Sequence, residues 1–260
     1  MSVAFNNDGS RLCVLNGGAV NGVKYAYPLL HTKSQKLTHA SCSCFTVDKK
    51  QGLIQLPNTL RYLGLNQTTP PNGPPGSVSH LTFTEDDSKL IASYKGNNGP
   101  GYLNVWDVQK DGSLSAQVTQ VPLASGGMVA FSLTHIPGEN AFLLTDPGVG
   151  FDIVDFSGKK RDSSVAVNGQ MATCWSTRSA KTGNYYTIDV GGNTIREVHI
   201  DGSLKGSVVA VRARSWQIFC YNPAHMRSSC SHTTCPRAPL PSTARLQRSA
   251  AKGKLTCWLR

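Results

Sequence analysis

Residues 81–93 read Leu81-Thr82-Phe83-Thr84-Glu85-Asp86-Asp87-Ser88-Lys89-Leu90-Ile91-Ala92-Ser93, two short apolar runs separated by an acidic, polar turn. Short apolar runs of this length on either side of a turn are typical of a β-hairpin. Acidic, Gly, Ser and Asn residues suit the turn because they accept the positive φ of a tight hairpin. The stretch therefore predicts two antiparallel strands.

The same hairpin pattern occurs three more times along the chain, at residues 3–15, 133–144 and 176–188. A further strand and turn follow each copy, at residues 44–53, 105–114, 151–158 and 195–204. These later runs alternate between apolar and polar residues, as a strand with one buried face must. The chain is therefore organised as four copies of one β unit.

The spacing of the copies predicts the architecture. The matching turn residues Asp87, Gly138 and Gly183 lie 51 and 45 residues apart, and a propeller blade takes about 40–50 residues. With 25 Gly, 14 Pro and only 16% charged residues, the composition also favours an all-β chain rich in turns. We predict a partial β-propeller of about four blades; an open β-sandwich is the alternative.

Two segments depart from this pattern. Residues 24–43 interrupt the strand pair between Val23 and Cys44, and they hold three Lys and no acidic residue. Residues 212–260 hold seven Arg and two Lys and no acidic residue. We therefore expect a propeller domain over 1–211 with an insertion at 24–43, and a basic, disordered tail over 212–260.

The charge distribution argues against a specific nucleic-acid partner. The net charge of +11 belongs mostly to the two departing segments, so the repeats themselves are close to neutral. The sequence holds no apolar run long enough to span a membrane, and its N-terminus does not have the pattern of a signal peptide. The chain starts inside a strand–turn–strand pattern, so we expect the true start of the domain to be missing.

Four stretches carry a more particular resemblance. They are Leu15-Asn16-Gly17-Gly18-Ala19-Val20-Asn21-Gly22, Leu65-Asn66-Gln67-Thr68-Thr69-Pro70-Pro71-Asn72-Gly73-Pro74, Pro147-Gly148-Val149-Gly150-Phe151-Asp152 and Gly169-Gln170-Met171-Ala172-Thr173-Cys174-Trp175-Ser176. With the repeat, they make residues 1–23 and 44–209 resemble the fungal 3-carboxymuconate cyclases of the lactonase (6-phosphogluconolactonase-like) propeller family.

The resemblance implies a seven-bladed propeller, of which this chain covers about four blades. It implies an extracellular or cell-wall location, no cofactor, and activity on carboxylated lactones or muconates. Relatives lack the insertion at 24–43, which we interpret as a retained intron. They continue with further blades beyond Arg212, so we interpret the tail as translation in a wrong frame.

The resemblance places the site in the central channel, lined by the innermost strands and the adjacent loops. Many lactonase propellers carry His-x-His before an inner strand, but Ser77 and Ser79 hold those places here. The candidate acid–base and carboxylate-binding residues are His80, His135 and Arg178. A satisfied strand-edge histidine, a buried hydrogen-bonded histidine and an exposed turn arginine are the respective structural alternatives. Phe131 and Trp175 occupy matching places ahead of inner strands, where they either line the channel or pack in the core.

Other polar residues give weaker signals. Asp146, Asp152 and Asp189 are too far apart in sequence to claim a metal site, and the Cys and His residues of the tail lack a second pair at finger-like spacing, so we predict no metal. Cys13 and Cys174 are either a disulfide or buried thiols, which the sequence does not decide. Asn66 begins an N-glycosylation sequon in a Pro-rich loop.

Two functions of different class remain. The first is an enzyme, a lactonase or cycloisomerase acting on a small carboxylated molecule. The second is a non-catalytic secreted or cell-wall glycoprotein that uses the propeller as a surface for a cell-wall or host component. The missing His-x-His favours the second, and the family resemblance favours the first. Fold alone does not choose between them.

Overall fold

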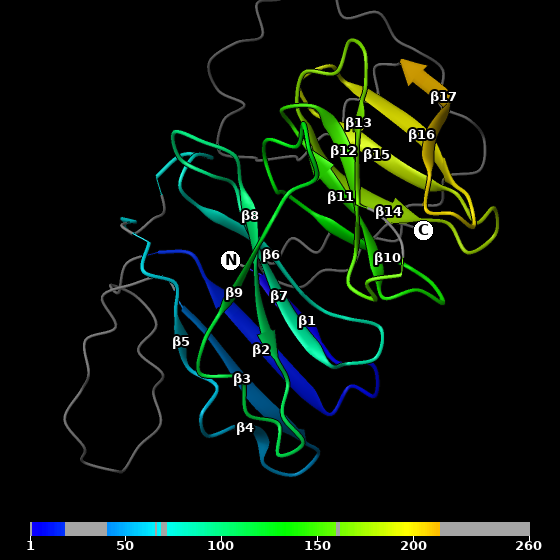
Figure 1. Cartoon of the computed structure of the whole chain (residues 1–260). Helices are drawn as coiled ribbons and strands as arrows, with labels where there is room; N and C mark the ends of the chain where they lie inside the picture. Colours follow the sequence, from blue (N-terminus) through cyan, green and yellow to red (C-terminus); the bar gives the residue numbers. More distant parts are fainter. Residues whose placement is uncertain (1, 19–40, 66, 69–71, 160–161, 214–260) are drawn as a thin grey trace, which may run out of the picture. The chain divides into compact units, whose positions relative to one another are not determined.

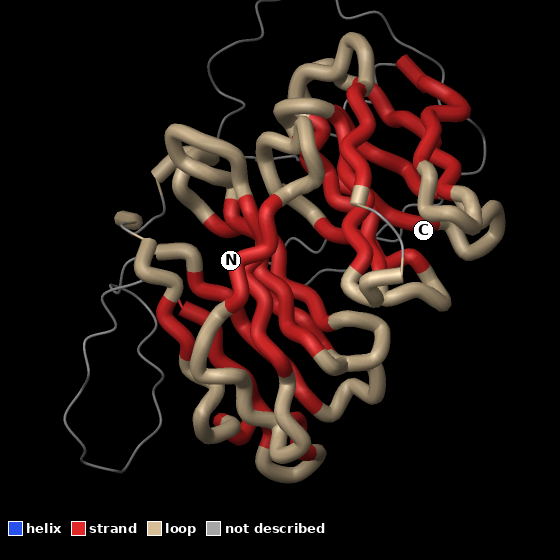
Figure 2. Tube along the Cα trace, in the orientation of Figure 1, coloured by secondary structure: helices blue, strands red, loops and turns tan. Residues whose placement is uncertain are grey.

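The computed structural model describes residues 2–18, 41–65, 67–68, 72–159 and 162–213, which form seventeen strands and no helix (Figures 1 and 2). The strands form four antiparallel sheets, and in each sheet four sequential strands are neighbours. The expectation of an all-β chain built from four copies of one β unit is therefore confirmed. No helix within the described ranges has the length and apolarity to cross a membrane.

The sheets follow the chain in order. Sheet 1 consists of β1 (Ser2–Phe5), β2 (Arg11–Asn16), β3 (Ser41–Asp48) and β4 (Gly52–Gln55), with the short β5 (Arg61–Tyr62) paired to β3. Sheet 2 consists of β6 (Val78–Phe83), β7 (Lys89–Tyr94), β8 (Tyr102–Asp107) and β9 (Thr119–Pro122). Sheet 3 consists of β10 (Leu133–Ile136), β11 (Ala141–Asp146), β12 (Gly150–Asp155) and β13 (Ser163–Ala166). Sheet 4 consists of β14 (Thr173–Arg178), β15 (Tyr185–Asp189), β16 (Thr194–Ile200) and β17 (Gly206–Ala213).

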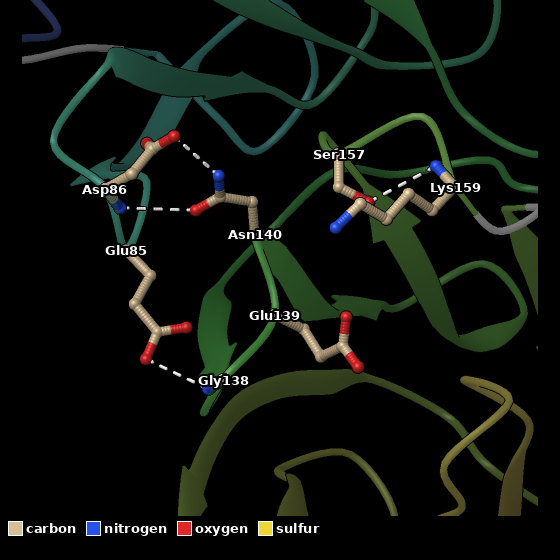
Figure 3. Close-up of a pocket in the computed structure, with 7 residues that line it drawn as sticks. All are labelled: Glu85, Asp86, Gly138, Glu139, Asn140, Ser157 and Lys159. Atoms are coloured by element: carbon tan, nitrogen blue, oxygen red, sulfur yellow. Dashed lines mark hydrogen bonds between the residues drawn. The ribbon is translucent and has the colours of Figure 1, made fainter.

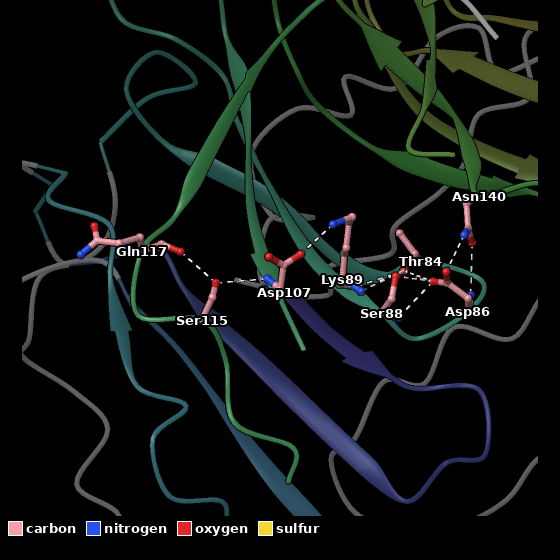
Figure 4. A network of polar contacts seen from close by, with 8 residues as sticks. All are labelled: Thr84, Asp86, Ser88, Lys89, Asp107, Ser115, Gln117 and Asn140. Carbon is pink, nitrogen blue, oxygen red and sulfur yellow. Dashed lines mark hydrogen bonds and ion pairs between the residues drawn. The ribbon is translucent and has the colours of Figure 1, made fainter. Parts of the chain in front are cut away.

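The turn between the first two strands of each sheet has the predicted conformation. Its matching residues Gly9, Asp87, Gly138 and Gly183 all have positive φ, between 56° and 79°. In sheet 2, the carboxylate of Asp86 organises the turn by accepting hydrogen bonds from neighbouring side chains and backbone (Figure 4). It also accepts a bond from Asn140 of sheet 3, at 2.6 Å, so the turn joins two sheets.

Three apolar cores join the four sheets. Sheets 1 and 2 share a core that includes Leu15, Phe83 and Trp106. Sheets 2 and 3 share a second core around Phe142, and sheets 3 and 4 a third around Phe151. Each sheet therefore packs on the next along the chain, and burial of these side chains is the main stabilising contribution.

The first strands of successive sheets lie against one another, with β1 contacting β6, β6 contacting β10, and β10 contacting β14. In a β-propeller, successive four-stranded meanders pack face to face, and their innermost strands lie side by side. These residues do not form two sheets closed over a single core, as the alternative β-sandwich would require. The described residues are a partial propeller of four blades.

The boundaries of the departing segments differ from the sequence interpretation. Residues 41–43, assigned to the insertion, belong to β3 and pair with residues 14–16 of β2. The interpretation failed there because a single alternating run does not reveal how far its partner strand extends. Residues 212 and 213, assigned to the tail, likewise belong to β17. The rest of the insertion over 24–40 and of the tail over 214–260 lies outside the described residues.

A disulfide joins Cys13 of β2 to Cys44 of β3, which are direct partners in the strand register. Of the two candidate body cysteines, Cys13 is thus bridged, whereas Cys174 is a free, half-buried thiol. Cys42 is a second free thiol in the described residues, and burial raises its pKa to about 12. A thiol with so high a pKa is protonated at neutral pH and unreactive.

Candidate functional site at the loop ends of sheets 2 to 4

Three successive sheets bring side chains together where their first strands begin. Lys95 follows β7, Phe131 precedes β10, and Trp175 lies in β14. The Lys95 Nζ atom lies 4.6 Å from the centre of the Phe131 ring, a cation–π contact. The Phe131 ring meets the Trp175 ring edge-on, with 5.3 Å between centroids. We call Lys95, Phe131 and Trp175 the loop-end cluster.

Lys95 is the charged member of the loop-end cluster. Its Nζ donates a hydrogen bond to Ser77 Oγ at 3.2 Å, and no carboxylate pairs with it within the part of the chain that the structure describes. Burial lowers the pKa of Lys95, while the nearby Cys174 thiol acts in the opposite direction. A half-buried ammonium without an anionic partner is suited to an anionic ligand.

Lys95 also lines a cavity of about 210 Å³, together with Pro74, Pro75, Gly96, Asn97, Asn98, Gly99 and Val129. The wall is formed by the β7–β8 loop, which needs glycine at its bend. Gly96 has a φ of +78°, and a Cβ there would lie 2.3 Å from the carbonyl oxygen of Gly99. The cavity is bordered mainly by apolar surface, including Pro74, Pro75 and Val129, beside one cation, a composition common in small-molecule sites.

Two aspartates hold the loops that carry the aromatic residues. Asp146, at the end of β11, accepts hydrogen bonds from the backbone N–H groups of Met128 and Val129 at 2.6 and 2.9 Å. Asp189, at the end of β15, accepts the equivalent bonds from Met171 and Ala172 at 2.9 and 2.8 Å. These carboxylates fix the approach to Phe131 and Trp175, so their role is to position the loop-end cluster.

A third aspartate, Asp152 of β12, is buried beside Asp146. Its Oδ1 accepts a hydrogen bond from Ser164, and its Oδ2 has no hydrogen-bond partner among the residues that the structure describes. Burial, with repulsion from Asp146 as a lesser cause, raises the pKa of Asp152 to about 7. Arg196 occupies the equivalent register in sheet 4, where it pairs with Asp189 at 2.9 Å. Sheet 3 therefore has a carboxyl group where sheet 4 has a compensating cation.

The two candidate histidines lie between β6 and β10 and are both engaged. His80 Nδ1 accepts a hydrogen bond from the backbone N–H of Leu133 at 2.8 Å. His135 Nε2 lies 3.1 Å from Thr82 Oγ1. Burial, with His135 as a second cause, lowers the pKa of His80 to about 4, and burial also lowers that of His135. Both rings are thus neutral at pH 7 and connect sheets 2 and 3.

The third candidate, Arg178, lies at the other end of its strand, before the β14–β15 turn. Its guanidinium lies 6.0 Å from the centre of the Tyr185 ring. The structure therefore brings His80 and His135 together but places Arg178 at the end of its strand opposite to Trp175. The candidate glycosylation residue Asn66 lies outside the described residues.

A second cavity, of about 290 Å³, lies at the turn ends of sheets 2 and 3 (Figure 3). Among the described residues, the carboxylates of Glu85, Asp86 and Glu139 line it together with the ammonium of Lys159. Burial opposes ionisation of Asp86, but hydrogen bonds from Ser88, Thr84 and Asn140 outweigh it and lower its pKa. This acidic cavity repels an anionic ligand, so the loop-end cluster is the better candidate site for one.

Sequence reasoning left Phe131 and Trp175 open between channel lining and core packing, and it missed Lys95. A signal was present, because Lys95 directly follows the second strand of its repeat, where the other copies carry Gly17, Pro147 and Val190. A lysine at one repeat position is still weak evidence, since surface lysines are common. Its significance depends on the neighbours that sheets 3 and 4 supply.

Fold and site together define an incomplete β-propeller with a cationic, aromatic cluster at its loop ends. No family model matches the sequence, and no curated protein matches it. Solved structures do match. One is the periplasmic gluconolactonase of Pseudomonas aeruginosa, with a TM-score of 0.59 and 15% identity over 84% of this chain and 58% of that chain.

A second match is a Bacteroides fragilis protein provisionally named 6-phosphogluconolactonase, with a TM-score of 0.53 and 15% identity over 82% of this chain and 56% of that one. A third is a protein of unknown function from Desulfotomaculum acetoxidans, with a TM-score of 0.55 and 13% identity. The chain spans 55–58% of the length of these structures. At such identities the likeness concerns the fold alone, and it agrees with the partial β-propeller described above.

Proposed function

We propose that the chain is part of a lactonase-type propeller that binds a small carboxylated lactone, or the corresponding open acid, at the loop-end cluster. The observation that carries this proposal is Lys95, half-buried, bordering a cavity, and without a carboxylate partner in the described part of the chain. An ammonium in that setting pairs well with a ligand carboxylate. The exposed face of Trp175, 47% accessible, offers an apolar platform for the ligand ring.

Lactone hydrolysis needs little beyond this arrangement and a proton acceptor. Water oxygen bonds to the ring carbonyl carbon, the ring C–O bond breaks, and the released alkoxide takes a proton while the attacking water loses one. Negative charge develops on the carbonyl oxygen during the attack, and a nearby ammonium stabilises it. The resemblance to 3-carboxymuconate cyclases extends the proposal to a carboxylated muconate, in whose cyclisation a carboxylate oxygen bonds to one carbon of a carbon–carbon double bond and the other carbon takes a proton.

A non-catalytic binding protein is the second candidate. The observation that favours it is the engagement of both histidines, because His80 and His135 each use a ring nitrogen in a bond between sheets 2 and 3. Neutral rings held in this way are poor general acids at pH 7. In that case the loop-end cluster holds a carboxylated cell-wall or host component without converting it.

An extracellular or cell-wall location is part of the proposal. The Cys13–Cys44 disulfide supports it, because structural disulfides persist in oxidising compartments and are rare in the cytosol. The sequon at Asn66 is compatible with this location and adds glycosylation to what is proposed.

The test is a comparison of three lysine variants. Lys95→Met keeps the apolar stem over Phe131 and removes the charge, Lys95→Arg keeps the charge, and Lys110→Met removes an exposed charge from a remote turn. Ligand-observed NMR with gluconate and cis,cis-muconate reports binding, and a pH-stat with glucono-δ-lactone reports hydrolysis. We expect Lys95→Met to weaken binding at least tenfold, with Lys95→Arg and Lys110→Met close to the unmodified chain.

The outcomes separate the two candidates. Binding together with acid release from the lactone supports the enzyme, and binding without release supports the non-catalytic protein. Equal binding by Lys95→Met and Lys110→Met shows that the loop-end cluster is not the site, and absence of binding by the unmodified chain overturns both candidates.

A further inference from the structure

Sheets 3 and 4 hold the loops before their first strands in the same way. Each of these loops, β9–β10 and β13–β14, donates two backbone N–H bonds to an aspartate at the end of the second strand of its sheet. The bonds run from Met128 and Val129 to Asp146, and from Met171 and Ala172 to Asp189. The two loops therefore form a matched pair within one chain, and they differ in the residue that lies beside the aspartate.

Beside Asp189 lies a cation that also holds the loop. The guanidinium of Arg196 donates to Asp189 Oδ2 at 2.9 Å and to the carbonyl oxygen of Gly169, in the β13–β14 loop, at 3.3 Å. In sheet 3 the same register holds Asp152, which lies beside Asp146. A charge pair thus secures the β13–β14 loop, whereas two carboxyl groups adjoin the β9–β10 loop.

The β9–β10 loop packs on Asp152. The Asp152 side chain is fully buried, and a Cβ atom at Gly127 of the loop would lie 3.3 Å from its Oδ1 atom. Oδ1 accepts a hydrogen bond from Ser164, while Oδ2 has no partner among the described residues. A buried carboxylate oxygen without a donor is costly. Because the loop packs on this carboxyl group, hydration of Oδ2 requires the loop to move.

Two further carboxyl groups face Asp152. Burial raises its pKa, and Asp146 of β11 and Asp162, which directly precedes β13, add to the shift. On the sheet 2 side, the core consists of apolar side chains that include Leu103 and Leu123. No ion pair to Asp152 is found in the part of the chain that the structure describes. Without a paired cation there, a proton on Asp152 compensates the two carboxyl groups while the loop is closed.

We propose that Asp152 and Asp146 are a proton-dependent latch on the β9–β10 loop, which closes over the pair when it holds a proton and opens when the proton leaves. The step is the loss of one proton from Asp152 Oδ2 to water, which leaves two carboxylates side by side. Their repulsion and the hydration that an ionised oxygen gains both favour the open loop. In the closed loop the proton allows Asp152 to donate a hydrogen bond to Asp146.

The latched loop forms part of the site at Lys95. Val129 borders the cavity beside Lys95, and the carbonyl oxygen of Met128 accepts a hydrogen bond of 2.7 Å from Gly101 N, at the end of the β7–β8 loop. Opening of the β9–β10 loop therefore changes the wall of that cavity and breaks its contact with the β7–β8 loop. The effect on ligand binding rests on the proposed function, whereas the movement itself does not.

The pH dependence has a definite direction. Asp152 keeps its proton up to about pH 7 when the loop is closed, whereas an aspartate in water loses it at about pH 4. Opening therefore becomes more favourable as pH rises from about 4 to about 7, by up to about tenfold per pH unit, and stays constant at higher pH. Burial opposes ionisation of Asp189, but its hydrogen bonds outweigh burial and lower its pKa to about 2. The β13–β14 loop should therefore not respond over this range.

Hydrogen exchange on the unmodified chain tests the latch without any ligand. The protection of the Met128 and Val129 amides is measured at pH 5 and pH 7, with correction for the intrinsic pH dependence of exchange. The equivalent amides of the β13–β14 loop, Met171 and Ala172, are the internal control. We expect protection of the first pair to fall by at least about tenfold and that of the control pair to stay constant. An unchanged first pair, or equal changes in both pairs, overturns the inference.

Asp152→Asn tests the assignment of the titrating group. It removes the proton-binding carboxyl and keeps a side chain that the same register accepts in sheet 2, where Asn104 lies. Asp162→Asn is the matched control, because it removes a neighbouring carboxyl group and leaves Asp152 in place. We expect the protection of Met128 and Val129 to become independent of pH in Asp152→Asn and to keep its pH dependence in Asp162→Asn. A pH dependence that persists in Asp152→Asn overturns the inference.

A ligand experiment relates the latch to the loop-end cluster. If the closed loop is the binding form, cis,cis-muconate at about ten times its Kd raises the protection of Met128 and Val129 at pH 7 by about tenfold. Muconate that binds, as seen by ligand-observed NMR, without changing their protection overturns the link between the latch and the site. Absence of muconate binding contradicts the proposed function, and the exchange data on the unmodified chain still decide whether the latch exists.

Discussion

Asp152 of sheet 3 and Arg196 of sheet 4 hold the same register position. The exchange of a carboxyl group for a guanidinium at this position determines how buried charge is balanced in each sheet. The Arg196–Asp189 ion pair is buried, whereas Asp152 lies beside Asp146 and pairs with no cation among the described residues. Burial is the main cause that raises the pKa of Asp152 to about 7, and repulsion from Asp146 adds to it. Asn104 occupies the same register in sheet 2, so the fold accepts a neutral amide there.

Asp152→Asn is therefore expected to stabilise the protein at alkaline pH. In the folded state Asp152 keeps its proton up to about pH 7, whereas an unfolded aspartate loses it near pH 4. Its contribution to stability is thus fully present below pH 4 and lost as pH rises to 7. Urea titrations should show Asp152→Asn more stable than the unmodified chain at pH 8, on the order of 2–4 kcal/mol. If the difference in unfolding free energy between Asp152→Asn and the unmodified chain were the same at pH 5 and pH 8, Asp152 would not retain its proton in the folded state.

His80 gives the opposite pH dependence. Its folded pKa of about 4 lies below the ordinary value of 6.5, so the unfolded chain binds the proton first and stability falls as pH drops from 6.5 to 4. His80→Asn supplies an amide oxygen that can accept the bond from Leu133 N–H, without a titrating ring. We expect the variant to match the unmodified chain at pH 7.5 and to be more stable at pH 4.5 in thermal melts. A large loss at pH 7.5 would mean that the ring is needed for more than this bond.

Among the elements, the β2–β3 pair has the strongest local constraint. The disulfide closes a loop between Cys13 and Cys44, with a sequence separation of 31 residues. In the chain-entropy account, a bridge over a loop of that length stabilises the folded state by about 3–4 kcal/mol. Cys13→Ala with Cys44→Ala should lower the free energy of unfolding by that order in urea titrations, and Cys174→Ala serves as the control. A double variant as stable as the control would show that the bridge contributes little.

The segment between β2 and β3 offers a test of where the strand begins. Deleting residues 24–40 leaves all of β3 in place, and we expect the melting temperature to stay within a few degrees. Deleting 24–43 also removes the strand partners of residues 14–16, together with the buried side chain of Cys42. The longer deletion should therefore melt clearly lower by differential scanning fluorimetry. Equal melting temperatures would show that residues 41–43 add nothing to the sheet, and a low value for the shorter deletion would show that 24–40 is structural.

At the scale of the whole molecule, stability depends on the contacts between sheets rather than on any one sheet. Phe142 is fully buried between sheets 2 and 3 and contacts the rings of His135 and Phe156. Phe142→Ala should cost about 3–5 kcal/mol in the free energy of unfolding, measured by urea titration. Phe5→Ala, on an exposed position, should cost far less. Similar costs for both variants would mean that Phe5 is covered within the single chain.

The sequence by itself determined the repeat and what depends on local pattern. Alternating apolar runs and turn residues predicted four antiparallel units, and the positive φ of Asp87 and Gly138 follows from the turn chemistry alone. The tertiary structure decided the rest. The pairing of Cys13 with Cys44 depends on strand register, and the loop-end cluster joins Lys95 to residues about 35 and 80 positions away in two other sheets. A period of two residues assigns side chains to faces of a sheet, but which face meets which is settled only when the sheets pack, because that contact is made between distant parts of the chain.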